Sequence, residues 1–354
     1  MVIQEINSLE GLAEIGPAWN SLLKDARTNT IFQTHEWVSS WWEVYGKNSR
    51  LCVLVLKEGE EIRGIAPLML RDYKVFRRLT LIGGNRADYS DFIVHKDQPE
   101  DYQAFLSYLA FGLRNYDEVM LENVPDTSPL LHALDENSPR FIIKKHVIDV
   151  CPYLTLDERT EEILRNIERK QSLKRKMKKL SEKGTLRFRH YSDQEEMEKA
   201  LGPLLEAYLQ RFDRANLKKR LPLEIDFHLE LLRRMGPKEM IQFSVLELDD
   251  QPIAQHFGFS YNGVYHWVKP GFNPLYAEHS PGVVMLYYLI EHAWKNGYRE
   301  FDFLRGKEPF KTNIAEHFRQ VMMVKLYRSF PKSILCEAGT KLSRWLQGGV
   351  FRQT

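Results

Sequence analysis

The stretch VYHWVKPGFNPLYAEHSPGVVMLYYLIEHAWKNGYREFDFLRGKEPFKTNI occupies residues 264–314 and indicates the fold class. Its first five residues, 264–268, are typical of a strand, and residues 269–274 predict a turn-rich loop. Apolar periodicity then predicts a helix over 282–294, and residues 301–304 a second strand between two glycines. Strand, helix and strand in this order favour an α/β fold.

The expected helix begins with Ser280, Pro281 and Gly282. Serine is a good N-cap and proline a good first helical residue, while glycine lets a ligand approach the backbone closely. The free N–H groups of a first turn attract anions. The residues are compatible both with an ordinary capped helix and with a site for a phosphate or pyrophosphate.

Asp302 alternates with Phe301 and Phe303 and therefore points to the opposite face of its strand. A buried carboxylate without a partner is costly. We therefore expect Asp302 to be either a general base or the counter-ion of Arg305 or Lys311.

The two halves of the chain look like diverged copies. A shift of 191 residues (245 minus 54) aligns residues 54–62 with 245–253, and a slightly different shift aligns 115–119 with 297–301. Met120 lies near the place of Asp302, which indicates that the second half carries the chemistry. We expect a degenerate first domain over 1–150, a second domain over 151–330, and an amphipathic tail over 331–354.

Composition limits the class of protein. The 354 residues suggest two domains at about 150 residues each. Hydrophobic residues make up 43% and aromatic residues 12%, which is enough for two cores. The 50 basic and 48 acidic residues leave a net charge of +2, which excludes a disordered chain and a uniformly basic nucleic-acid protein.

We expect a cytoplasmic protein without a resident metal. The apolar run 282–290 is far shorter than the roughly 20 residues of a membrane span, and the N-terminus lacks the pattern of a signal peptide. Cys52, Cys151 and Cys336 fit neither a disulfide framework nor a zinc site.

One segment is strongly basic. Residues 165–183 hold nine basic and two acidic side chains, a local charge of +7, within a helix expected over 160–184. Its cationic face includes Lys174, Arg175, Lys178 and Lys179. It is either a solvated connecting helix or a contact for a polyanion: an anionic membrane surface at the inner face, a tRNA acceptor end or an acidic glycan.

The chain resembles GNAT-type acyltransferases of the CelD/BcsL group, which is associated with cellulose biosynthesis and related to the FemAB peptidoglycan enzymes. The resemblance covers about residues 30 to 325. In the second half it rests on residues 267–272, 280–282, 297–298, 302–306 and 308–311, and in the first half on 32–33, 41–42, 65–68 and 88–92. Phe310 stands where the family usually has tyrosine.

This resemblance implies a tandem GNAT fold of two mixed sheets with helices on both faces. It also implies that acyl-CoA lies between the fourth strand, 264–268, and the fifth, 301–304, with its pyrophosphate on helix 282–294. The usual Arg/Gln-x-x-Gly-x-Gly/Ala loop is absent. Because FemAB enzymes use aminoacyl-tRNA, the donor stays open between acyl-CoA and a charged tRNA.

Acyl transfer needs a base for the nucleophile and N–H donors for the oxyanion. The candidate bases are Asp302, His256, His266 and Glu278. The two histidines lie on adjacent strands and are expected to reach one cleft, unless they are ordinary sheet residues. Tyr287 or Tyr288 either protonates the leaving thiolate or packs in the core. The residues expected to bind the cofactor are Ser280, Pro281, Gly282, Lys269, Arg305 and Lys311.

The sequence therefore predicts an acyl-CoA-dependent (for example acetyl-CoA-dependent) N- or O-acyltransferase acting on a small-molecule or glycan acceptor. A FemAB-like aminoacyl-tRNA transferase is the enzymatic alternative. A non-catalytic module that binds a polyanion or a membrane is the other alternative.

Overall fold

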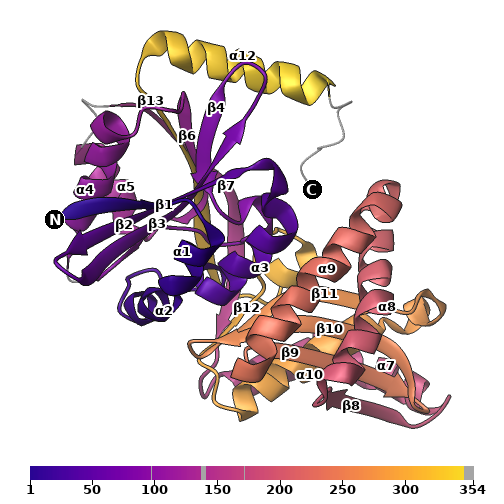
Figure 1. Ribbon diagram of the computed structural model, residues 1–354. Helices are drawn as coiled ribbons and strands as arrows, with labels where there is room; N and C mark the ends of the chain where they lie inside the picture. Colours follow the sequence, from indigo (N-terminus) through magenta and orange to yellow (C-terminus); the bar gives the residue numbers. More distant parts are fainter. Residues whose placement is uncertain (97, 137–140, 171, 347–354) are drawn as a thin grey trace. The chain divides into compact units, whose positions relative to one another are not determined.

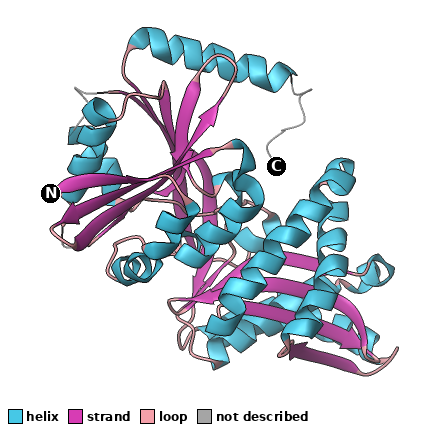
Figure 2. Cartoon of the chain, viewed as in Figure 1, coloured by secondary structure: helices cyan, strands magenta, loops and turns pink. Residues whose placement is uncertain are grey.

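The computed structural model describes residues 1–96, 98–136, 141–170 and 172–346 (Figure 1). The chain forms two compact units, Met1–Asp149 together with the chain from Gln320 on, and Val150–Arg319. Each unit combines a mixed sheet with helices, as the α/β prediction requires (Figure 2). No helix among these described residues is long and apolar enough to cross a bilayer.

The first unit contains a sheet in the order β1-β2-β3-β4-β6-β13, with β5 paired to β3. Among the described residues of this unit, β4 and β6 pair in parallel and the other strand pairs are antiparallel. Its strands are β1 (Val2–Ile6), β2 (Arg50–Glu58), β3 (Glu61–Asp72), β4 (Arg77–Leu81), β5 (Ile93–Val94), β6 (Glu118–Pro125) and β13 (His317–Tyr327). Its helices are α1 (Leu9–Glu14), α2 (Gly16–Lys24), α3 (His35–Tyr45), α4 (Asp101–Ser107), α5 (Pro129–Glu136) and α12 (Phe330–Leu346).

The second unit contains a sheet in the order β7-β12-β11-β10-β9-β8. Helices α8 and α9 lie over one face of this sheet, whereas α10 lies on the other with α6 and α7 (Figure 1). Its strands are β7 (Ile142–Thr155), β8 (Leu186–His190), β9 (Ile241–Leu248), β10 (Gln251–Tyr261), β11 (Val264–Phe272) and β12 (Glu300–Asp302). Two strands are divided between the units: residues 142–149 of β7 belong to the first unit, and residues 317–319 of β13 belong to the second. Its helices are α6 (Thr160–Lys170), α7 (Leu173–Ser181), α8 (Gln194–Phe212), α9 (Leu217–Met235), α10 (Pro281–Lys295) and α11 (Pro309–Thr312).

The two sheets repeat one topology, which confirms the expected duplication. In each, three antiparallel strands (β2-β3-β4 and β9-β10-β11) are followed by a parallel partner (β6 and β12). The next strand is antiparallel in both sheets, and each comes from a distant part of the chain. Strand β13 pairs with β6, and β7 pairs with β12.

This arrangement moves one expected boundary. The second domain was expected to end at residue 330, but Val321 pairs with Pro125 and Tyr327 with Glu118 in the first unit. Backbone hydrogen bonds to β6 therefore assign the chain from Gln320 on to the first unit. The expected amphipathic tail forms α12, of which Trp345 and Leu346 are the last residues described.

Two local expectations also differ from the structure. Residues 269–272, expected as loop, continue strand β11. The single basic helix expected over 160–184 is divided into α6 and α7, because Ser172 has a left-handed φ of 50° that a continuous helix does not allow.

Candidate active site

The central feature of the second unit is the place where β11 and β12 separate. They pair only at Val264 with Glu300, Tyr265 with Phe301, and His266 with Asp302. Strand β12 ends there, whereas β11 continues to Phe272. The backbone N–H of Phe303 donates to Pro152 O at 3.0 Å, so the chain after β12 turns toward β7. One edge of β11 is consequently open beyond His266.

A β-bulge lies at the same position. Phe257 pairs with Lys269 and Phe259 with His266, so that two residues of β11 oppose Gly258 alone. A Cβ atom at Gly258 would lie 2.6 Å from the backbone oxygen of His266, and only glycine fits. Bulges of this kind redirect side chains and are common beside active sites.

His256 stabilises this bulge from the β10 side. Its Nε2 accepts a hydrogen bond from the N–H of Val268 at 3.2 Å, and its ring stacks on Trp267 with centroids 4.5 Å apart. The ring is fully buried. Burial lowers the pKa of His256 to about 3, with a smaller contribution from His190, so the ring is neutral and its lone pair is available.

His266 lies on the opposite face of the sheet. It shares its face with Phe259, its register partner, whereas His256 packs with Trp267 on the α10 face. The expectation that both histidines reach one cleft therefore does not hold. The two-residue turn at Asn262 and Gly263, both with positive φ, sets this register and is a signal that sequence reasoning can use.

Asp302 and His266 occupy one register position on neighbouring strands, and both side chains are buried. Asp302 Oδ1 accepts a hydrogen bond from the N–H of Leu304 at 2.7 Å. Its Oδ2 lies 3.3 Å from Arg319 Nη1. Leu304 has a left-handed φ of 59°, an uncommon conformation for a non-glycine residue that this side-chain hydrogen bond stabilises.

Arg319 was not predicted from the sequence. It also binds Glu300, with Nη2 and Oε2 3.1 Å apart, and its guanidinium lies 4.4 Å from the ring centre of Tyr153. Burial and the negative charge of Asp302 raise the pKa of Glu300, and Arg319 opposes them. The site thus holds two carboxylates, one imidazole and one guanidinium.

The counter-ions expected for Asp302 have other roles. Lys311 is buried, and its ammonium donates to the backbone oxygen of Arg305 at 2.7 Å and pairs with Glu308 at 3.1 Å. Lys311 therefore holds the loop after β12 together, while Arg319 pairs with Asp302. Arg305 is half-buried in the same loop.

A short 3-10 helix, Pro274–His279, connects the open end of β11 to the start of α10. Ser280 is the N-cap residue, but it has a left-handed φ of 51° and its side chain makes no capping bond. Its backbone oxygen instead accepts from the N–H groups of Val283 and Val284, at 3.0 and 3.4 Å. A Cβ atom at Gly282 would meet only Phe272, at 3.6 Å, so the first turn can be approached closely.

The remaining predicted residues lie on different sides of the sheet. Lys269 lies on the α8–α9 face, 4.0 Å from Glu224 and 4.3 Å from the ring centre of Tyr208, and not beside the start of α10. Tyr287 is half-buried on α10, and burial followed by the charge of Glu291 raises its pKa. Tyr288 stacks on Phe188, and Glu278 is an exposed partner of His279 and Lys183.

Comparison with known families bears on this unit. Residues 168–312 match the family described as "Acetyltransferase (GNAT) domain". These residues are similar to a GNAT domain. Its matched segment includes β8 to β12, α8 to α10, the separation of β11 from β12 and the start of α10. No curated protein matches the chain.

Solved structures with the same fold cover both units. FemX is 10% identical, with a TM-score of 0.63 over 92% of this chain and 97% of its own. L-PGS from Bacillus licheniformis is 11% identical, with a TM-score of 0.54 over 93% and 96%. A tandem GNAT protein from the clavulanic acid biosynthesis pathway is 8% identical, with a TM-score of 0.50 over 92% and 98%. At these identities the likeness establishes a tandem GNAT fold.

The described residues also bear on whether the protein could hold a metal ion. Among the residues described, no group of three or more His, Cys, Asp or Glu side chains is placed to hold a metal ion.

Proposed function

We propose that the protein is an acyl-CoA-dependent N- or O-acyltransferase that acts on a polar acceptor. The observation that carries this proposal is the open edge of β11 beyond His266, followed by the start of α10. A GNAT domain covers both features. The extended pantetheine arm of a thioester would lie along this edge, where strand backbone groups are free to bind it.

The first turn of α10 would hold the pyrophosphate. Helix N-termini attract anions through the helix dipole and free N–H groups. Gly282 leaves the backbone accessible, since its nearest neighbour for an added Cβ is the Phe272 ring. Lys269 and Lys311 are assigned no part in holding the cofactor, because each is engaged elsewhere.

We assign the proton transfer to His266. Both oxygens of Asp302 are already engaged by Leu304 and Arg319, which makes Asp302 better suited to orient a neighbouring imidazole than to take a proton. In the transfer, the acceptor nitrogen or oxygen bonds to the thioester carbon and gives its proton to His266. The C–S bond breaks, and the departing thiolate is protonated. His256 is a positioning residue that supports the bulge.

Calorimetry of CoA binding tests the cofactor site. The Gly282→Glu variant places a carboxylate at the start of α10 and should weaken CoA at least tenfold through repulsion and lost access. Gly202→Glu is the matched control, because Gly202 lies in helix α8 with nothing within 4 Å of an added Cβ. Equal affinity of both variants for CoA would contradict the assignment.

An aminoacyl-tRNA donor is the second candidate, and one surface favours it. Exposed cations cover α6 and α7, with the side chains of Lys174 and Arg165 82% and 69% exposed. A tRNA acceptor end or an anionic membrane surface would bind such a face through its phosphates. FemX, which has the same fold, supports including this candidate.

Charge reversal distinguishes the donors. Changing Lys174, Arg175, Lys178 and Lys179 to glutamate should abolish turnover with charged tRNA if that is the donor, and should leave turnover with acyl-CoA unchanged. A folded Asp302→Ala variant that keeps its cellular function would instead support a non-catalytic module.

A further inference from the structure

A cavity of about 590 Å³ lies in the second unit, and its wall includes Phe272, which also neighbours Gly282 at the start of α10. Its walls are the first half of α8, the sheet face formed by β8, β9 and β10, and the end of β11. Neither His266 nor Asp302 lines it. The volume is within the range of small-molecule sites, about 300–1,000 Å³.

Small residues on α8 keep this space open. Ala200, Pro203 and Ala207 follow each other at helical spacing and line the cavity. Larger side chains there would fill it. Pro203 also has no N–H, so the backbone oxygen of Lys199 lacks its usual helical donor. That oxygen belongs to a residue of the cavity wall.

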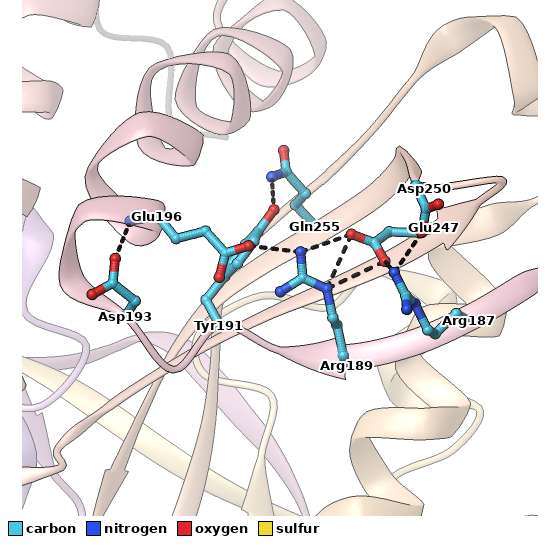
Figure 3. Close-up of polar contacts among 8 residues, drawn as sticks. All are labelled: Arg187, Arg189, Tyr191, Asp193, Glu196, Glu247, Asp250 and Gln255. Carbon is cyan, nitrogen blue, oxygen red and sulfur yellow. Dashed lines mark hydrogen bonds and ion pairs between the residues drawn. The ribbon is translucent and has the colours of Figure 1, made fainter.

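A network of charged side chains forms the floor (Figure 3). Glu247 is 3% exposed and pairs with Arg187 at 3.1 Å and Arg189 at 2.9 Å. Arg189 also binds Glu196 at 2.7 Å, and Arg187 binds Asp250. Three carboxylates and two guanidinium groups leave one net negative charge. Lys199, the other cation of the wall, pairs with Glu195 on the surface of α8.

Hydrogen-bond acceptors are left over around this floor. Arg189 binds Oε1 of Glu196, and within the described residues Oε2 of Glu196 has no hydrogen-bond partner. Gln255 donates from Nε2 to Tyr191 at 2.9 Å, which leaves its Oε1 as a further acceptor. Arg189 donates from Nε and Nη2 to Glu196 and Glu247, and within the described residues no hydrogen bond from its Nη1 is found. The remaining acceptors and the net negative charge favour a ligand that supplies donors and a positive charge.

We propose that this cavity binds a small polar molecule that carries an ammonium group and hydroxyl groups. The ammonium would pair with Glu196, and the hydroxyls would meet Gln255 and the backbone oxygen of Lys199, whose usual helical donor is replaced by Pro203. A cation would neutralise the excess charge of the floor, whereas an anion would add to it. The cavity is a second ligand site of the GNAT domain, and it does not depend on the identity of the acyl donor.

Glucosamine and glucose are a matched pair of probes, because they differ by one amino group in place of a hydroxyl. Calorimetry with the full chain should give binding of glucosamine at least about tenfold tighter than glucose, since a charge-assisted hydrogen bond is gained. Added salt should reduce that difference. Equal binding of the two sugars, or no binding of either, would overturn the proposal.

Two variants locate the site. Glu196→Gln should reduce glucosamine affinity about tenfold and keep the fold, because Arg189 retains Glu247. Glu198→Gln removes an exposed carboxylate of the same helix that does not line the cavity, and it should change nothing. Ala200→Leu should abolish binding by filling the cavity. CoA affinity should stay unchanged in all three, which separates this test from that of the transfer site. Binding unaffected by both Glu196→Gln and Ala200→Leu would place the ligand elsewhere.

Discussion

The neutral, buried ring of His256 leads to a prediction about pH and stability. The ring accepts a hydrogen bond from Val268 N–H and stacks on Trp267. The variant His256→Phe keeps an aromatic ring against Trp267 and removes both the Nε2 acceptor and the buried Nδ1–H, which has no hydrogen-bond partner within the described residues. Above the ordinary histidine pKa, we expect the variant to be less stable by about 1–2 kcal/mol, because the unsatisfied Val268 N–H costs about 1–3 kcal/mol and the removal of the unpaired Nδ1–H offsets part of that cost.

The pH dependence has a definite sign. The pKa of His256 is about 3 in the folded protein against 6.5 in the unfolded chain, so the unfolded state binds the extra proton first. The stability of the native protein is therefore fully present above about pH 6.5 and is lost as the pH falls toward 3, by at most about 1.4 kcal/mol per pH unit from this group. The His256→Phe variant has no such group and does not lose stability in this way. The difference in unfolding free energy between wild type and variant should therefore reach zero one to two units below pH 6.5, near about pH 5.

Urea unfolding followed by tryptophan fluorescence at a series of pH values measures the effect. The difference in unfolding free energy between wild type and His256→Phe should shrink steadily as the pH falls and then change sign. His190, whose pKa burial lowers to about 4, titrates in both proteins and cancels in the difference. His132→Gln is the control, because the His132 side chain is 81% exposed. Parallel stability curves for wild type and His256→Phe would refute the account of His256.

Two further substitutions test the bulge and the carboxylate pair. Gly258→Ala should destabilise the protein by about 1–3 kcal/mol, because its Cβ would lie 2.6 Å from the backbone oxygen of His266, whereas Gly202→Ala should be neutral or stabilising. Thermal unfolding compares the two variants, and a smaller loss of stability at Gly258 than at Gly202 would contradict the bulge. Arg319→Met leaves Asp302 buried beside the carboxylate of Glu300 and should destabilise the folded protein by about 3 kcal/mol at neutral pH. The loss should be smaller in acid, where one of the two carboxyl groups takes up a proton, and a loss of stability that does not depend on pH would argue against the ion pair.

Much of the fold could be predicted from local signals. The local pattern of residues 264–304 predicted strand β11, helix α10 and strand β12. The shift of 191 residues matches the starts of β2 at Arg50 and β9 at Ile241. Strands, helices and helix starts of this kind depend on residues that are close together along the chain, and they can therefore be predicted from the sequence.

The candidate site was only partly predictable. Asp302 was identified as a residue that needs a partner, but the partner is Arg319, 17 residues away on another strand. The opposite faces of His256 and His266 follow from the register of β10 and β11. A bulge changes that register by one residue, and alternation alone does not locate a bulge.

The sequence by itself determined an α/β chain of two related halves and a helix that begins near Pro281. The tertiary structure decided which strand completes each sheet: β13 joins β6, and β7 joins β12. It also decided which charges meet at Asp302. The physical reason is that strand pairing and ion pairing join segments far apart in the chain, and their energy depends on geometry that no local pattern encodes.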